Sequence, residues 1–266
     1  MTNDPVDGEP PPLVAADLAQ ALIRPGGLWR EIRVVAATGS TNTGLLKAAA
    51  AGAAEGVVLA AETQTAGRGR MGRSWVSPPR AALIFSVLLR PADVPASRRG
   101  WVPLLTGVAA VSALRRVASV DAVLKWPNDV LVRHKKLAGI LAEQNGGAIV
   151  AGIGINVHTS PPGPAGAAAT SLEAEGAPVS RDRLLAAVLS ELEHLYLRWA
   201  RDPDGCGLRE QYQSMCDTIG RTVRVELPGG RVLAGTAADV DAHGRLVVRD
   251  AGSLTAVSAG DVVHVR

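Results

Sequence analysis

Hydrophobic and polar positions along the chain predict a protein of mixed helices and strands. Continuous or alternating apolar runs predict strands over residues 31–36, 57–62, 82–90, 122–126, 130–133, 137–143 and 148–157. Apolar residues recurring every three or four positions predict helices over residues 13–28, 40–54, 101–117, 181–201 and 208–217. Because several strands follow one another directly, we expect an α+β fold with a mixed sheet flanked by helices, not an alternating βαβ repeat.

The pattern changes after Ile219, where short alternating strands replace the longer elements. Strands separated by glycine-containing turns are predicted over residues 222–227, 231–240, 245–249, 254–258 and 262–265. Five such strands in fewer than fifty residues are typical of a small β-barrel. We therefore expect a disordered leader at residues 1–12, a larger domain at residues 13–217 and a barrel domain at residues 218–266.

Composition indicates a soluble globular protein, because 47% of the residues are hydrophobic and 20% are charged. We find no uninterrupted apolar run of the ~18 residues that a transmembrane helix needs. The N-terminus is acidic and Pro-rich, where a signal peptide would be basic and then apolar. Cys206 and Cys216 form no CxxC pair, so neither a disulfide framework nor a metal site is expected. These features predict a cytoplasmic protein.

One stretch, 64-QTAGRGRMGRSW-75, fits neither the strand period nor the helix period. Its glycines let successive backbone N–H groups converge on an anion, and Arg68, Arg70 and Arg73 add planar donors suited to carboxylate or phosphate. The net charge of the chain is only +3, so this positive charge is a local feature. We interpret the stretch as a loop that closes over an anionic ligand; a solvated loop and an RNA-binding segment are the alternatives.

Three further segments carry polar residues or glycines in apolar surroundings. The Pro-Asn-Asp run of 125-KWPNDV-130 suits a plain turn as well as a site. In 136-KLAGIL-141, Lys136 opens an apolar strand, and its side chain points either into a cleft or out to solvent. Gly139 within the strand indicates either a ligand that approaches the backbone closely or a bulge. Alternate glycines in 152-GIGINV-157 leave one strand face bare for a flat ligand or a packed helix.

Taken together, these motifs resemble those of the biotin protein ligases. STN at residues 40–42, the arginine loop with its tryptophan, KWPNDV, KLAGIL and GIGIN occur in the order and spacing of that family. The resemblance runs from about Ser40 to the C-terminus. It is specific, since the related lipoate ligases share the fold but lack this arginine loop. It implies a class II synthetase-like catalytic domain of the biotin/lipoate ligase fold, followed by an SH3-like β-barrel.

The resemblance implies a two-step reaction on biotin and ATP, with Mg²⁺ accompanying the nucleotide. Biotin and ATP form biotinyl-5'-AMP and pyrophosphate. A lysine of a biotin carboxyl carrier protein, part of acetyl-CoA or other acyl-CoA carboxylases, then attacks the mixed anhydride. Bringing a carboxylate onto the α-phosphorus forces two anions together, so fixed cations must offset their repulsion. Loop closure would also exclude water from the hydrolysable intermediate.

By this resemblance, the cationic residues lie where the two anions meet. Arg68 and Arg70, with Gly67 and Gly69, belong to the loop that folds over biotin and the adenylate phosphate. Lys136 is expected to hydrogen-bond both the biotin carboxylate and the α-phosphate. No covalent enzyme nucleophile is required.

The neutral ureido end of biotin is expected to meet neutral donors and acceptors, namely Ser40, Thr41, Asn42 and Gln64. Gly139 and the GIGIN strand would form the pocket wall, with Asn156 near the phosphate or ribose. Trp75 would stack on adenine. Asp129 is the candidate to receive and orient the attacking lysine, which must be neutral to act as a nucleophile.

Bifunctional members of the family carry an N-terminal winged helix-turn-helix that represses biotin genes. Fewer than forty residues precede Ser40 here, so we expect the monofunctional class, with no DNA and no membrane partner. A nucleic-acid-binding module is the alternative of a different class, and it would leave KWPND and Lys136 without a role. A lipoate or octanoate ligase of the same fold is the nearer alternative.

Overall fold

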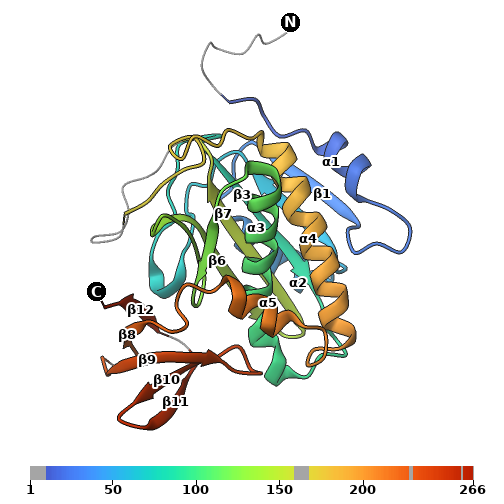
Figure 1. The fold of residues 1–266 in the computed structure, drawn as a ribbon. Helices are drawn as coiled ribbons and strands as arrows, with labels where there is room; N and C mark the ends of the chain where they lie inside the picture. The colour runs from blue at the N-terminus through green and yellow to red at the C-terminus, as the bar shows by residue number, and fades with distance from the viewer. Residues whose placement is uncertain (1–9, 159–167, 228–229, 259, 266) are drawn as a thin grey trace, which may run out of the picture.

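The structure is a computed structural model that describes residues 10–158, 168–227, 230–258 and 260–265. The described residues form two β-sheets and the helices that cover the larger of them (Figure 1). Most of the leader expected at residues 1–12 lies outside the described residues.

The larger sheet has seven strands in the order β1-β2-β3-β7-β6-β5-β4. These strands are β1 (Glu31–Val35), β2 (Val57–Ala61), β3 (Ala82–Leu89), β4 (Ala122–Lys125), β5 (Asp129–Val132), β6 (Lys135–Asn145) and β7 (Ala148–Asn156). Only the β1–β2 pair of this sheet is parallel, and its other neighbours are antiparallel. The expected mixed sheet is therefore confirmed.

Helices cover both faces of this sheet. The described helices are α1 (Ala15–Leu22), α2 (Thr41–Ala50), α3 (Val102–Ala118), α4 (Arg181–Arg201) and α5 (Leu208–Met215), with short 3-10 turns η1 (Arg70–Gly72) and η2 (Ala96–Trp101). Helices α3 and α4 lie side by side over one face of the sheet (Figure 1). The opposite face holds a separate apolar cluster in which Leu45 and Ala49 of α2 meet Leu88 and Val150. The sheet is thus the middle layer of three.

Helix α3 is apolar on nearly all sides because it is enclosed by the sheet, α4 and α5. Among the described residues, the segment Ala96–Ala118 is long and apolar enough to cross a membrane, and 72% of its apolar window is buried within the protein. A buried helix of this kind is the ordinary core of a globular domain.

Helix boundaries differ from the expected ones where glycine and proline intervene. Helix α1 ends at Leu22, before Pro25, although the apolar pattern continues to Leu28. Helix α2 ends at Ala50 because Gly52 follows with a φ of 89°, a conformation that favours glycine. The hydroxyl of Ser40 accepts a weak 3.5 Å hydrogen bond from the N–H of Thr43 at the start of α2, as expected of a helix cap.

The second sheet has five antiparallel strands in the order β11-β10-β9-β8-β12. They are β8 (Thr222–Glu226), β9 (Val232–Val240), β10 (Leu246–Asp250), β11 (Ser253–Val257) and β12 (Asp261–His264). Alternate residues such as Val223 and Val225 are buried, and they belong to the same apolar cluster as the core of the larger domain. This arrangement agrees with the expected small barrel.

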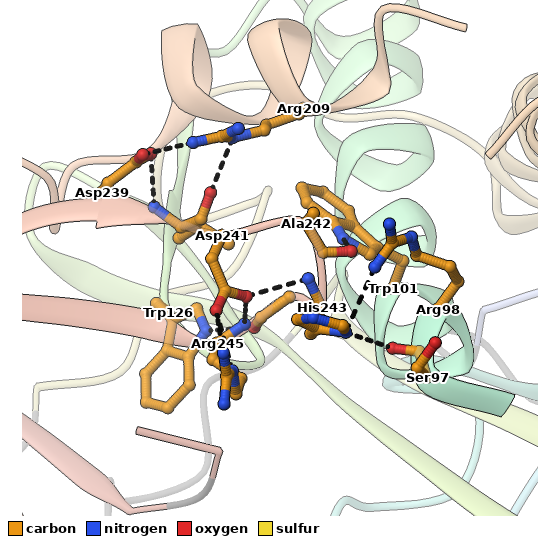
Figure 2. Close-up of polar contacts among 12 residues, drawn as sticks. Ser97, Arg98, Trp101, Trp126, Arg209, Asp239, Asp241, Ala242, His243 and Arg245 are labelled. Atoms are coloured by element: carbon orange, nitrogen blue, oxygen red, sulfur yellow. Dashed lines mark hydrogen bonds and ion pairs between the residues drawn. The ribbon is translucent and has the colours of Figure 1, made fainter. Parts of the chain in front are cut away.

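The turn between β9 and β10 docks the second sheet onto the larger one (Figure 2). The indole N–H of Trp101 donates to the carbonyl of Ala242 at 3.0 Å, and that of Trp126 donates to the carbonyl of Gly244 at 3.1 Å. A Cβ on Gly100 would lie 2.6 Å from the carbonyl oxygen of His243, so the two backbones touch. The turn therefore sits beside the KWPND segment.

Candidate active site

Successive side chains of strand β7 point to opposite faces of the sheet, and the predicted site residues gather on one of these faces. On the α2 side, Val150 packs in the apolar cluster, while Gly152 and Gly154 continue the same row. The carboxamide of Asn42, in the first turn of α2, lies directly over Gly152, where a side chain would overlap it. The glycines thus leave a row of this sheet face without side chains of its own next to the N-terminus of α2, and we call this row, from α2 to Lys136, the trench.

Trp75 lies on the glycine face that the sequence suggested for a flat ligand. A Cβ on Gly154 would approach the indole to 2.5 Å, and one on Gly139 of the neighbouring strand would approach it to 3.2 Å. In this structure the flat group on the glycines is therefore the protein's own ring. The Trp75 indole is half-buried, and its Nε1 has no hydrogen-bond partner among the described residues.

The residues predicted for the ureido end of biotin lie together. Gln64 Oε1 accepts hydrogen bonds from the backbone N–H of Thr41 at 2.8 Å and from its hydroxyl at 3.1 Å. Ser40, Thr41 and Asn42 are all buried at the start of α2. The structure thus brings these four residues to one end of the trench.

Ser86 and Glu143 complete this end and were missed by the sequence reasoning. Asn42 Nδ2 donates to Glu143 Oε2 at 2.8 Å and to the carbonyl of Leu141 at 3.0 Å, while its Oδ1 accepts from the Ser86 hydroxyl at 2.6 Å. Ser86 is fully buried. The one available signal was a serine within the otherwise apolar run 82–89.

The arginine-rich stretch forms a narrow hairpin-like loop. Arg68 and Ser74 form an isolated antiparallel bridge, the N–H of Gly69 donates to the carbonyl of Arg73 at 2.6 Å, and Met71 at the tip has a φ of 55°. At the base, the N–H of Trp75 donates to the carbonyl of Gly67 at 2.9 Å. The loop is thus a defined excursion from the sheet.

The three arginines of this loop reach three different partners. Arg68 pairs with Glu143 on β6 at 2.8 Å, and Arg70 donates to the side-chain oxygen of Asn128 at 3.1 Å. Arg73 pairs with Asp261, at the start of β12.

Arg70 differs from the other two because its partner is a neutral amide. Burial lowers the pKa of the Arg70 guanidinium, and the nearby carboxylates of Asp261 and Asp129 oppose that shift. Arginine nevertheless stays protonated throughout the physiological range. Arg70 therefore brings a positive charge to this region, and none of the carboxylates in the described residues is in hydrogen-bond contact with it.

Lys136 and Asp129 form an ion pair on neighbouring strands, with Nζ and Oδ1 2.6 Å apart. The pairing of β5 with β6 shifts by one residue after Val130, which indicates a bulge at Leu137, between Lys136 and Gly139. A Cβ on Gly139 would lie 3.2 Å from both Lys136 Nζ and the Trp75 ring. The ammonium is therefore next to the indole on the same glycine face.

Asn156 ends the trench on β7. Its Nδ2 donates to the carbonyl of Thr170 at 2.9 Å, whereas its buried Oδ1 has no hydrogen-bond partner among the described residues. The backbone of residues 168–170 runs beside Lys136, since the N–H of Lys136 donates to the carbonyl of Ala168 at 2.8 Å. This segment borders the ammonium end of the trench.

A cavity of about 710 Å³ adjoins the loop. Its wall combines the loop, the KWPND turn, β6, the start of α3 and the β9–β10 turn. The lining residues are 66–74, 126–128, 140–143, Gly100, Pro103, Leu104, Gly244 and, after β11, Ser258. Gly67, Arg68, Gly69 and Arg70 are the predicted site residues on this wall. Within the described ranges no group of three or more His, Cys, Asp or Glu side chains is arranged to hold a metal ion.

Comparison with known proteins relates this geometry to a family. Residues 34–160 match the biotin/lipoate A/B protein ligase family, and residues 218–265 match the biotin protein ligase C-terminal domain. The chain is 46% identical over 261 residues to the biotin–acetyl-CoA-carboxylase ligase of Mycobacterium tuberculosis (strain ATCC 25618 / H37Rv), covering 96% of this chain and 97% of that protein. The chain belongs to the biotin protein ligase family. The resemblance seen in the motifs is thereby confirmed.

Two further biotin protein ligase relatives extend the comparison. The bifunctional ligase/repressor BirA of Bacillus subtilis (strain 168) is 32% identical over 222 residues, which cover 79% of this chain and 66% of that protein. The structure of the Aquifex aeolicus biotin protein ligase in complex with biotin and ATP has a TM-score of 0.76 at 26% identity, covering 90% of this chain and all of that one. The expected biotin ligase fold is confirmed.

Proposed function

We propose that this biotin protein ligase carries out both steps of its reaction along the trench between α2 and Lys136. Biotin and ATP form biotinyl-5'-AMP and pyrophosphate, and the biotinyl group then passes to a lysine of a biotin carboxyl carrier domain. The observation that carries the assignment is one sheet face with Thr41, Asn42 and Gln64 beside the Arg68–Glu143 ion pair at one end, glycines in the middle and an ammonium at the other end.

The polarity of the trench sets the direction in which biotin binds. Its neutral ureido ring suits Thr41, Asn42 and Gln64, which offer amide and hydroxyl groups. Its carboxylate suits the ammonium of Lys136. A ligand with one neutral polar end and one anionic end therefore gains from both ends in only one orientation.

In the first step the carboxylate attacks the α-phosphorus of ATP and pyrophosphate leaves. Lys136 offsets the repulsion between these two anions, and Arg70 approaches the phosphate from the loop. Arg68 acts indirectly, because its guanidinium holds the loop against Glu143. Mg²⁺ enters with the triphosphate as part of the nucleotide substrate.

Two unpartnered polar atoms support a nucleotide at this end of the trench. Trp75 Nε1 and Asn156 Oδ1 are buried without a hydrogen-bond partner in the described part of the chain. Such atoms cost free energy unless a ligand or water satisfies them. We assign Trp75 to stacking with adenine, for which its half-buried ring offers surface, and Asn156 to the ribose or phosphate side.

In the second step the acceptor lysine attacks the carbonyl of the mixed anhydride and AMP leaves. Asp129 holds Lys136 in the first step and is placed to orient and receive a proton from the acceptor amine in the second. The product is an amide on the carrier. No enzyme nucleophile takes part, so the two thiols have no assigned role.

The acceptor is the biotin carrier domain of an acyl-CoA carboxylase, and we place the reaction in the cytoplasm. Residues 13–217 provide the substrate trench and residues 218–266 form the appended barrel domain. We expect neither DNA nor a membrane to be a partner of this protein.

Pyrophosphate release in the presence of ATP, Mg²⁺ and either biotin, lipoate or octanoate tests the assignment. Release with biotin supports it, and release with lipoate or octanoate but not biotin would reject it. A second assay supplies a biotin carboxyl carrier domain and detects the covalent product by mass spectrometry. Adenylate formation without any labelled carrier would reject the second step.

A further inference from the structure

The loop arginines fall into two groups by the charge of their partners. Arg68 and Arg73 each pair with a carboxylate, whereas Arg70 contacts a neutral amide. A paired guanidinium has its charge largely offset and serves to fix a position. Of the three, Arg70 is therefore the one suited to an anionic ligand, and the other two anchor the loop.

The anchor of Arg73 lies on the other sheet. Asp261 is the first residue of the edge strand β12, pairs with Glu226 of β8, and is 188 residues away from Arg73. Its carboxylate also lies close enough to Arg70 to raise the pKa of that guanidinium against the effect of burial. The second sheet therefore touches the loop at a point distinct from the β9–β10 turn.

The Asp261 contact is important because, in the described part of the chain, the polar contacts of residues 70–73 with other elements are those of Arg70 with Asn128 and of Arg73 with Asp261. The base is held through the N–H of Ala66, which donates to the carbonyl of Gly39 at 2.8 Å. Beyond it, Met71 at the tip is 61% exposed, and the side chains of Arg70 and Arg73 reach across to other elements. If Arg70 turns from Asn128 to a phosphate, the Arg73–Asp261 pair remains to hold the tip.

We propose that Asp261 is a positioning residue for the adenylate-forming site. Through Arg73 it holds the tip of the loop over the bound intermediate, so the C-terminal sheet takes part in retaining biotinyl-5'-AMP. Asp261 itself contacts neither substrate nor the reacting atoms. This inference rests on the proposed function and adds a residue to it.

The solvent exposure of the Arg73–Asp261 pair sets how strongly it can slow escape of the intermediate. The side chains of Arg73 and Asp261 are 46% and 35% exposed, so solvent and salt screen their attraction. Pairs of this kind contribute little free energy, which corresponds to about a two- to fivefold change in the rate at which the intermediate escapes. Escape from the unmodified protein is expected to rise with salt, since the pair is screened.

The experiment is a charge swap read out by escape of the intermediate. Protein is loaded with biotin and ATP-Mg²⁺, unbound ligand is removed, and release of labelled biotinyl-5'-AMP is followed without carrier. Asp261→Arg and Arg73→Asp are each expected to speed release, and the double variant Arg73→Asp/Asp261→Arg is expected to restore it. Asp250→Arg makes the same charge change at an exposed site on the same sheet and is the matched control.

The outcomes separate this inference from the proposed function. Failure of the unmodified protein to form any adenylate overturns both. Normal adenylate formation with unchanged release from Asp261→Arg, or a double variant no better than the single ones, overturns the positioning role alone. Asp261→Asn removes only the charge and is used if either reversal fails to fold. Its release rate is expected to depend less on salt than that of the unmodified protein, because the Arg68–Glu143 pair remains, and an equal salt dependence contradicts the proposal.

Discussion

The ammonium of Lys136 lies 2.6 Å from a carboxylate oxygen of Asp129 on the adjacent strand. Asp129 pairs with Gly139 in the ladder, and the missing side chain at Gly139 leaves room for the lysine and for Trp75. The pair therefore fixes a cation in a crowded part of the sheet without burying an unpaired charge.

Replacing Lys136 by alanine is expected to slow adenylate formation by about 100- to 1000-fold, because it removes the fixed cation at the point where carboxylate and phosphate meet. Single-turnover pyrophosphate release measures this rate. The variant is expected to remain folded, since Lys136 lies at the trench and not in the apolar core, and a thermal melt checks this. A rate near that of the unmodified protein would refute the assigned role.

Gly154→Ala is expected to weaken ATP binding, because the new methyl group would stand 2.5 Å from the Trp75 indole and displace it. Steady-state kinetics with ATP as the varied substrate measures the change as a higher KM. Gly147→Ala is the matched control, since nothing lies within 4 Å of its Cβ position. Equal KM values in the two variants would contradict the placement of Trp75 at the nucleotide.

Glu143→Gln and Arg68→Gln are expected to weaken biotin retention about two- to fivefold each, because their ion pair helps hold the loop. Both variants remove the Arg68–Glu143 ion pair, and Glu143→Gln also changes the acceptor of Asn42, so the double variant is expected to be little worse than Glu143→Gln alone. Dissociation of labelled biotin measures all three. Additive losses would show that the two side chains act independently.

Trp126→Phe and Trp101→Phe test the docked turn of the second sheet. Each removes one indole donor and leaves a carbonyl of the β9–β10 turn without it, so each is expected to lower the free energy of unfolding by about 1 kcal/mol. Denaturant titration measures that loss. Only Trp126→Phe is expected to lower kcat/KM for ATP. Trp126 directly precedes the turn that contains Asn128, and Asn128 accepts the hydrogen bond from Arg70.

The lowered pKa of His264 is expected to make the free energy of unfolding fall in acid. Burial, followed by the charge of Lys125, lowers the pKa of His264 from 6.5 to about 4; Asp217 opposes the shift, and Arg221 and His134 add to it. Between these pH values the unfolded chain binds a proton that the folded chain does not, so stability is lost as the pH falls from 6.5 to 4.

His264→Gln is expected to reduce this pH dependence, because glutamine does not titrate. Unfolding midpoints at pH 7 and pH 5 provide the comparison. The difference between the two midpoints is expected to be smaller in the variant than in the unmodified protein. A difference of equal size in both proteins would assign the acid sensitivity to other groups.

Local patterns were sufficient for the order and type of the elements. The run at residues 82–90 and the helix at residues 181–201 were predicted because apolar periodicity reports which side of a segment is buried. The same holds for the alternating strands after Ile219. The ends of α1 and α2 were less well predicted, since a cap depends on a few residues and competes with continued apolar periodicity.

The sequence by itself determined the family, the candidate residues and the fact that the glycines leave one strand face open. Only the tertiary structure decided that Trp75 covers this face, that Ser86 and Glu143 fix Asn42, and that each loop arginine has a different partner. The physical reason is the range of the interactions. Backbone periodicity and glycine conformation are local, whereas the Arg73–Asp261 pair joins residues 188 positions apart that meet only when both sheets have folded.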